Sequence, residues 1–239
     1  RYKTMPLSDA LNYLTKREGQ LYLIEQGKRT AWSYQPLKVS KGRSYYYEYF
    51  KDGATIYPRP FFFIEVMDIS EDLVIVRPAR RVERREAKVK FDIPQSPVEK
   101  QFVYGVLTSN ELIPFYYLQP ALAVLPIRPQ GNGYIILKAD ALRRLGYPNV
   151  ADWMKRAEEL WNRYRGEKRE RMDIYQQLNY MNKLTAQNPS AKYRVVYNVS
   201  GTHLTAAVVE VGKRVIETDI GKVEVSDVII DYTLFVYHT

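Results

Sequence analysis

The sequence predicts an α+β protein of mostly antiparallel or mixed β-sheets with a helical insertion. Short apolar runs of strand length recur along the chain and are separated by breaks rich in Pro, Gly and Asn. One stretch, residues 149–187, instead carries apolar side chains at helical spacing. No unit of about 20–50 residues repeats, so a solenoid or propeller is not expected.

Residues 1–96 are expected to form a basic, β-rich N-terminal part. Pro58 and Pro60 interrupt the strand-like run over 55–67, and because proline cannot donate to a ladder, this strand is expected at a sheet edge. The charged segment 77–90 is expected to be a strand or an exposed ribbon. The elements predicted before it are a helix over 6–16 and strands over 21–24, 55–67 and 73–76.

Residues 97–239 are expected to form the second, α+β part, after a break at Pro94–Pro97. A helical hairpin over 149–187 would turn the face that carries Trp153 and Trp161 into the core, with a second helix over 172–186. One continuous domain is the alternative to this division. The predicted strands are 102–107, 121–125, 193–197, 204–211, 214–218 and 228–237.

Composition and charge narrow the class of protein. Apolar residues make up 46% and charged residues 26%, which is ordinary for a globular protein. No apolar run approaches the roughly 18 residues of a membrane span, so a cytoplasmic protein without a membrane partner is expected. Without cysteine, thiolate metal sites and thiol nucleophiles are excluded, and only His203 and His238 remain as imidazole ligands.

The net charge of +9 favours a polyanionic partner, and the excess is concentrated in the first 90 residues. Residues 1–90 hold 18 Lys and Arg against 11 Asp and Glu, or +7, whereas residues 91–239 hold 18 against 16, or +2. The 21 tyrosines suit nucleic acid because aromatic rings stack on bases and phenols donate to phosphates. Packing within sheets is the alternative use of tyrosine.

Several catalytic motifs are missing. The sequence has no phosphate loop, no dinucleotide glycine fingerprint and no Gly-x-Ser-x-Gly. It also lacks the Asn/Asp/Ser-Pro-Pro-aromatic tetrapeptide of amino-methyltransferases. Asp72 followed by Glu86-Ala87-Lys88 is a loose nuclease-like pattern, in which carboxylates bind magnesium. We therefore predict no catalytic and no metal site on this chain, with a magnesium-dependent nuclease as an alternative.

Four stretches of the chain carry recognisable motifs in a fixed order. They are Tyr45–Arg59 with the following Phe61–Phe63, Phe102–Pro126, Ala151–Gln187 and Arg194–Ala207. The motifs within them are Gly-Ala-Thr followed by Pro-Arg and an aromatic run, Ser-Asn-Glu before Ile-Pro-Phe, Lys-Leu-Thr-Ala-Gln, and Tyr-Asn-Val-Ser-Gly-Thr-His. Together the four stretches resemble the C-terminal, non-catalytic half of adenine-specific DNA methyltransferases, a family that includes type IIG-like proteins fusing modification to restriction.

The resemblance implies sequence-specific binding of double-stranded DNA as a target-recognition domain. In such proteins a methyltransferase domain, in the same chain or on another subunit, uses S-adenosylmethionine and flips the adenine, while phosphate and base contacts elsewhere offset the cost. Because the chain starts at Arg1, it is expected to be a piece of a longer protein, with no cofactor of its own.

The expected DNA contacts come from basic side chains and from loops rich in donors. Arg59 and Lys183 are expected at phosphate or guanine, with a surface ion pair as the alternative. The loop Ser200-Gly201-Thr202-His203 allows close backbone approach at glycine, with a plain hairpin turn as the alternative. The full set of predicted DNA-binding residues is Arg59, Arg80, Arg81, Arg84, Arg85, Ser109, Lys183, Ser200, Gly201, Thr202 and His203.

Other classes of function remain open on the sequence alone. A protein-interaction or scaffold module that docks a catalytic subunit would use the tyrosine-rich surface as its interface. Binding of RNA is a further alternative, because aromatic platforms also suit single strands.

Overall fold

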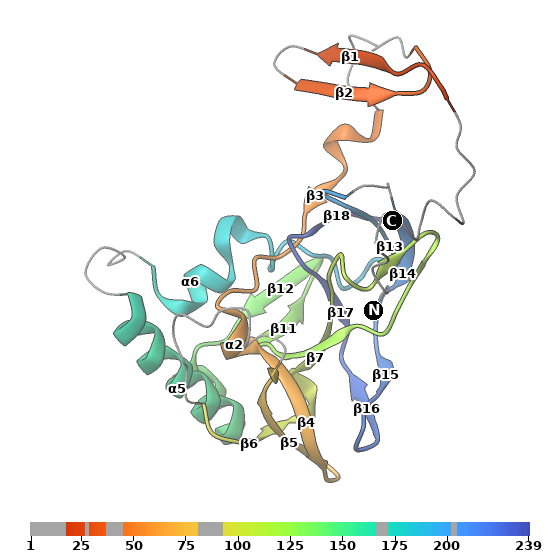
Figure 1. Ribbon diagram of the computed structural model, residues 1–239. Helices are drawn as coiled ribbons and strands as arrows, with labels where there is room; N and C mark the ends of the chain where they lie inside the picture. The colour runs from red at the N-terminus through yellow and green to blue at the C-terminus, as the bar shows by residue number, and fades with distance from the viewer. Residues whose placement is uncertain (1–17, 27–28, 37–44, 81–92, 166–171, 202–204) are drawn as a thin grey trace. The chain divides into compact units, whose positions relative to one another are not determined.

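The computed structural model describes residues 18–26, 29–36, 45–80, 93–165, 172–201 and 205–239. The chain forms two compact units, Arg1–Tyr47 and Glu48–Thr239. In the first unit, β1 (Tyr22–Gln26) pairs antiparallel with β2 (Arg29–Ser33), so the strand predicted over 21–24 is found (Figure 1). The helix predicted over 6–16 lies outside the described residues. A 3-10 turn, η1 (Tyr45–Glu48), spans the division between the units.

The second unit is built on a six-stranded sheet in the order β17-β7-β10-β4-β5-β6. Neighbouring strands run antiparallel except β17, which runs parallel to β7. The mixed sheet and the helices beside it confirm the α+β class. The strands are β4 (Phe63–Ile69), β5 (Leu73–Pro78), β6 (Ser96–Glu99), β7 (Val103–Leu107), β10 (Ala121–Val124) and β17 (Val228–Ile230), with a 3-10 turn, η2 (Lys100–Phe102), before β7.

The strand predicted at a sheet edge lies inside the sheet. β4 pairs with β10 on one side and with β5 on the other. Pro58 and Pro60 precede the strand, at the start of the short helix α2 (Arg59–Phe62). Proline is tolerated in a first helical turn because the missing N–H has no partner there anyway. The edge prediction is therefore wrong, since neither proline belongs to the ladder.

The position between residues 96 and 97, where the sequence suggested a division, falls within β6. This strand pairs with β5 through Val76 opposite Ser96 and Leu73 opposite Glu99. Strands from both sides of residue 96 thus share one sheet, and their apolar side chains share one core. Both sides of residue 96 accordingly belong to the unit Glu48–Thr239.

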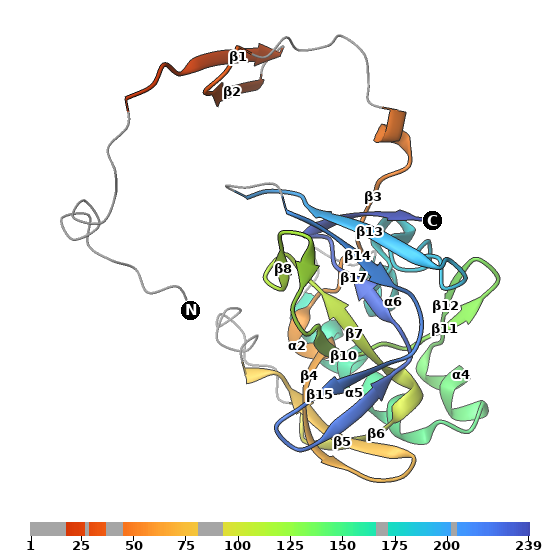
Figure 2. The ribbon, with the colours of Figure 1, turned by 90° about the vertical axis from the view of Figure 1, so that its right-hand side faces the viewer.

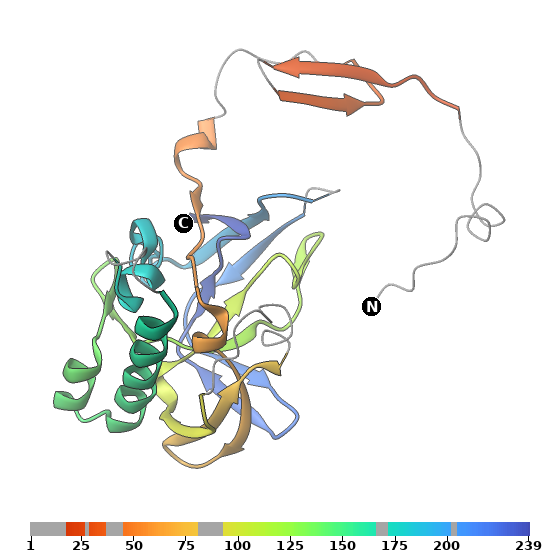
Figure 3. The same cartoon turned by 60° about the vertical axis from the view of Figure 1, so that its left-hand side comes forward.

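The principal helix, α5 (Pro148–Arg165), confirms the prediction made from apolar periodicity. Trp153 and Trp161 are buried, and the Trp153 indole N–H donates to the carbonyl oxygen of Phe61 at 2.9 Å. The carboxylate of Glu99, on β6, accepts from Val150 N at 2.8 Å near the helix N-terminus. Figure 3 shows α5 beside α4 (Ala139–Arg144), on one side of the strands. Among the described residues, no helix is long and apolar enough to cross a membrane.

The second predicted helix, 172–186, is found only in its first part. It is α6 (Ile174–Leu178), followed by a 3-10 turn, η4 (Tyr180–Asn182). Met181 and Asn182 adopt left-handed φ values of 56° and 59°, which no helix continues. The side-chain oxygen of Asn179 accepts from Thr185 N at 3.1 Å. This local bond replaces the helical ladder and explains the early end.

A four-stranded sheet, in the order β14-β13-β18-β3, lies next to the end of β7 and β17 (Figure 2). Its inner face packs on a second core that includes Leu107, Val196 and Ile230. Three two-stranded hairpins complete the unit. The strands of this sheet and of the hairpins are β3 (Lys51–Asp52), β13 (Tyr193–Asn198), β14 (Ala206–Glu210), β18 (Leu234–His238), β8 (Leu112–Ile113), β9 (Tyr116–Tyr117), β11 (Ile127–Gln130), β12 (Gly133–Ile136), β15 (Arg214–Glu217) and β16 (Lys222–Val225).

Candidate nucleic-acid interface

The turn between β17 and β18, Asp231-Tyr232-Thr233, is the point on which several predicted site residues converge. Backbone bonds fix it on both sides: Asp231 N donates to Leu107 O at 3.0 Å, and Tyr232 N donates to Ala54 O at 2.9 Å. Figure 1 shows β3 and β18 next to each other, at the end of the sheet where β17 finishes. Segments far apart in the sequence therefore meet at this turn.

Arg59, at the start of α2, is held over this turn. Its Nη2 donates to both carboxylate oxygens of Asp231, at 3.2 and 3.3 Å. The guanidinium carbon lies 5.1 Å from the ring centre of Phe63 and 5.8 Å from that of Tyr232. The Asp231 side chain is fully buried, whereas that of Arg59 keeps 22% of its surface exposed. Arg59 thus forms the ion pair that was the alternative to a DNA contact, but its partner Asp231 is buried and does not lie on the surface.

Asp231 serves as the anchor of this cluster. Burial raises the pKa of its carboxyl group, and the charge of Arg59 and the hydrogen bonds from Thr233 offset only part of that rise. Thr233 donates to Asp231 Oδ1 from its backbone N at 3.1 Å and from its hydroxyl at 2.9 Å. Because the Asp231 carboxylate accepts hydrogen bonds from both Arg59 and Thr233, it fixes the orientation of these two side chains.

Thr233 links the turn to two predicted loops. Ser109 N donates to the Thr233 hydroxyl oxygen at 3.0 Å, which ties the loop after β7 to the Asp231 cluster. Val199 N donates to Thr233 O at 3.1 Å, and the next two residues, Ser200 and Gly201, are exposed. Thr202 and His203 lie outside the described residues. β13 and β14 pair on either side of this loop, so it does connect two antiparallel strands.

Lys183 contacts β3, the strand that pairs with β18. Its ammonium lies 2.7 Å from Asp52 Oδ2 on β3, and the next residue, Gly53, donates its N–H to Leu234 O at 3.0 Å. The Asp52 side chain is 45% exposed, so solvent screens this pair. We call the set Arg59, Ser109, Lys183, Ser200, Gly201 and Tyr232 the turn surface.

Of the predicted DNA contacts in the charged segment 77–90, the structure describes only Arg80. Arg80 is exposed, and its backbone N donates to Glu65 Oε1 at 2.9 Å. Arg81, Arg84 and Arg85 lie outside the described residues, as do Glu86 and Lys88 of the nuclease-like pattern. Asp72, the remaining member of that pattern, lies exposed between β4 and β5. Within the described ranges, no group of three or more His, Cys, Asp or Glu residues is arranged to hold a metal ion.

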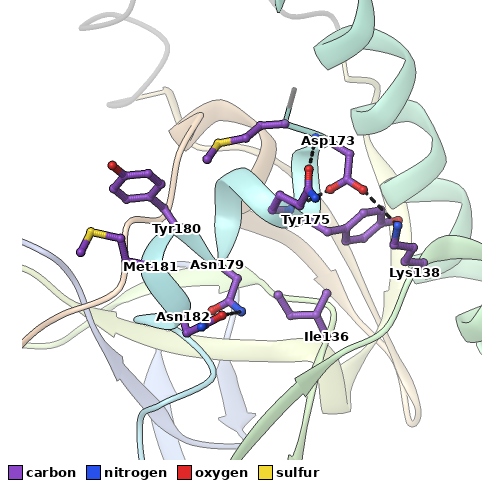
Figure 4. Close-up of a pocket in the computed structure, with 10 residues that line it drawn as sticks. Ile136, Lys138, Asp173, Tyr175, Asn179, Tyr180, Met181 and Asn182 are labelled. Carbon is purple, nitrogen blue, oxygen red and sulfur yellow. Dashed lines mark hydrogen bonds and ion pairs between the residues drawn. The ribbon is translucent and has the colours of Figure 1, made fainter. Parts of the chain in front are cut away.

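A separate hollow of about 690 Å³ lies beside α6 and η4 (Figure 4). Its polar side chains are engaged with their own surroundings. Lys138 contacts Asp173 at 3.0 Å, and the Tyr175 hydroxyl accepts from Ala139 N at 2.9 Å. The amide nitrogen of Asn179 donates to Thr185 Oγ1 at 3.0 Å. These contacts give the hollow a structural explanation, so we do not assign the site to it.

Three residues of the turn were missed by sequence reasoning, which extended one strand through 228–237. Asp231-Tyr232-Thr233 separates two apolar runs, and Asp is typical of turns because its side chain bonds the backbone two residues on. The Asp231 side chain does so here, accepting from Thr233 N. This signal was available in the sequence.

Comparison of the chain with protein-family models, curated proteins and solved structures finds no match. The likeness to adenine-specific methyltransferases therefore rests on the ordered motifs of the sequence. The structure adds where those motifs lie. Arg59, Ser109, Lys183 and Ser200 come from all four stretches. Arg59 and Ser109 bond to the turn and Ser200 follows a residue that does, whereas Lys183 contacts Asp52 on β3, the strand that pairs with β18.

Proposed function

We propose that this chain binds double-stranded DNA through the turn surface, as the target-recognition part of an adenine-specific DNA methyltransferase system. The methyl transfer itself would belong to a domain that binds S-adenosylmethionine, in the same protein or on a partner subunit. The observation that carries the proposal is that three of the four motif stretches bond to the turn Asp231–Thr233, while Lys183 of the remaining stretch contacts β3, which pairs with β18.

The chemistry of the turn surface suits a polyanion with base edges. Arg59 contacts Asp231 through Nη2, and a guanidinium carries further N–H donors on Nε and Nη1. Lys183 supplies an ammonium, while Ser200 and Tyr232 are exposed residues that carry hydroxyl groups. Phosphate contacts of this kind set the register of a protein on DNA, and hydroxyl and guanidinium groups read bases.

The net charge of +9 adds a general attraction that depends on salt. Each phosphate contact releases counterions, so the logarithm of the affinity falls linearly with the logarithm of the salt concentration, by about 0.9 per contact. This slope can be measured without knowing the recognised sequence. It is therefore the first property to test on the full chain.

The experiment measures binding to a duplex of about 30 bp by fluorescence anisotropy from low to moderate salt. We expect Lys183→Gln to weaken binding and to reduce the slope by about 0.9, because one phosphate contact is lost. Lys222→Gln is the matched control: it removes the same charge from the β15–β16 hairpin, where Lys222 is 72% exposed beside Glu217.

Two outcomes would contradict the proposal. Wild-type protein whose affinity for duplex DNA is negligible, or does not change with salt, would exclude a DNA-binding role. Equal loss in Lys183→Gln and Lys222→Gln would show attraction by net charge alone and would remove the turn surface as the contact region. Stoichiometric capture of a protein partner without DNA would favour the scaffold alternative.

A further inference from the structure

Phe115 is the most exposed large apolar side chain among the described residues, at 94% of its surface. It lies at the tip of the β8–β9 hairpin, flanked by Tyr116 at 64% and Leu118 at 51%. Exposed apolar side chains that gather in one patch, as these three do, often mark a binding site.

The backbone at the tip is strained. Leu112 pairs with Tyr117 and Ile113 with Tyr116, which leaves Pro114 and Phe115 as a two-residue turn. Proline followed by a residue with positive φ is the type II arrangement, and that second position normally takes Gly or Asn. Phe115 occupies it with φ of 60°. A bulky residue is thus held where a small one would fit better, which points to a use for the ring itself.

Hydrogen bonds and packing hold the rest of the hairpin in place, so the backbone that carries the Phe115 ring is well anchored. Phe115 N donates to Ala206 O on β14 at 2.9 Å, and Leu118 N donates to Glu111 O at 2.7 Å. Leu112 is buried in the second core. The guanidinium carbon of Arg214 lies 5.3 Å from the ring centre of Tyr117 on β9.

The hairpin adjoins the turn surface at both ends. Ser109, only three residues before β8, bonds to Thr233 of the turn. At the tip, Ala206 belongs to β14, directly after the loop that carries Ser200 and Gly201. Figure 2 shows β8 below the end of the β13–β14 hairpin. The hairpin is thus connected to the turn surface through Ser109 and through the strand that follows the Ser200 loop.

We propose that Phe115 is a wedge that enters the duplex between neighbouring base pairs. The inference rests on the proposed DNA-binding function and adds how the DNA is deformed. Architectural and base-flipping proteins insert apolar side chains between base steps, which unstacks them. The Phe115 ring is held out at the tip of a tight turn, ahead of Tyr116 and Leu118, and so suits a gap between bases, whereas a protein interface uses a broad surface of many side chains.

The test places 2-aminopurine beside a TA step, which unstacks readily, in duplexes of about 30 bp and follows its fluorescence on binding of the full chain. Wild type is expected to raise the signal because the base leaves the stack. Phe115→Asn should remove the rise and weaken binding on the order of tenfold. Asn tolerates positive φ, so this variant keeps the turn while it loses the ring. Phe115→Trp should retain the rise.

Met181→Asn is the matched control, because Met181 is also an exposed apolar residue, at 70%, with φ of 56°. It should leave the fluorescence rise intact. A rise that survives in Phe115→Asn overturns the wedge while DNA binding stands, and it would assign the hairpin to a protein contact. An equal loss in both variants also overturns it. Wild type that fails to bind the duplex refutes the proposed function itself.

Discussion

Replacing Arg194 with Met should destabilise the second unit strongly, because it breaks a buried ion pair. The Arg194 side chain is fully buried and that of Asp227 is 4% exposed. Arg194 Nη1 donates to Asp227 Oδ1 at 3.0 Å and Nη2 donates to Oδ2 at 2.8 Å. Nη1 and Nη2 also donate to the carbonyl oxygens of Val228, at 2.6 Å, and Asn188, at 3.1 Å. The variant leaves a carboxylate without its cation.

Removal of one partner from a buried pair costs about 3–5 kcal/mol of unfolding free energy. Asp227 would keep some compensation, since Gly212 N at 3.0 Å, Val228 N at 2.7 Å and the Tyr134 hydroxyl also donate to it. That places the expected loss toward the lower end of the range. For a unit of this size, about 3 kcal/mol corresponds to a fall in Tm of roughly 6–12 °C.

Urea denaturation followed by tryptophan fluorescence measures this loss, because Trp153 and Trp161 are buried in the second unit. Arg194→Met combined with Asp227→Asn should recover a large part of the stability, since no buried charge is then left unpaired. A single-variant loss below about 1 kcal/mol, which is near the range of surface substitutions, would refute the reasoning.

Two further predictions concern the same unit. Burial, and next the charge of Arg194, lower the pKa of His238 to about 4 from an ordinary 6.5, so protons bind the unfolded chain first as the pH falls. The free energy of unfolding, measured in urea, should therefore be level above pH 6.5 and decline between pH 6.5 and 4. His238→Gln should lack this decline. An identical pH profile in both proteins would contradict the role of His238 in it. Gly53→Ala would place a Cβ 2.2 Å from the carbonyl oxygen of Asp231, so thermal unfolding should show a loss of at least about 2 kcal/mol, and an unchanged Tm would contradict this contact.

Local sequence patterns predicted the elements whose side chains alternate or recur regularly. α5 could be placed because its apolar residues follow a period of 3.6 over 18 residues. β13 could be placed because Tyr193–Asn198 is rich in aromatic and β-branched residues, which favour strands. Both signals lie within one element, so no information about distant partners is needed.

One of the misplaced elements depends on distant pairing. The position of β4 inside the sheet is decided by β10 and β5, and Pro58 and Pro60 gave a false edge signal because they belong to α2. A window of the sequence does not contain that pairing. The early end of α6 has a local cause instead: the side chain of Asn179 bonds to Thr185, six residues on, and the spacing of apolar residues does not report such a bond.

The candidate site shows the same division between local and distant information. Arg59 and Ser109 could be chosen as polar residues in suggestive motifs, but their link through Asp231 and Thr233 joins positions up to 172 residues apart. Only the folded chain reveals that the two belong to one cluster. The position of Phe115 on a strained turn likewise follows from the pairing of β8 with β9.

The two cations of the turn surface should differ in how they serve a bound duplex. The carboxylate of Asp231 is buried and cannot swing away, so Arg59 keeps this partner and offers its remaining N–H groups in a fixed direction. Asp52 is nearly half exposed, and a screened pair of this kind is worth little, so Lys183 can exchange it for a phosphate. On the proposed mode of binding, Arg59 would supply orientation and Lys183 would supply salt-dependent affinity. The change in salt slope is therefore expected for Lys183 and not for the arginine that is held by a buried carboxylate.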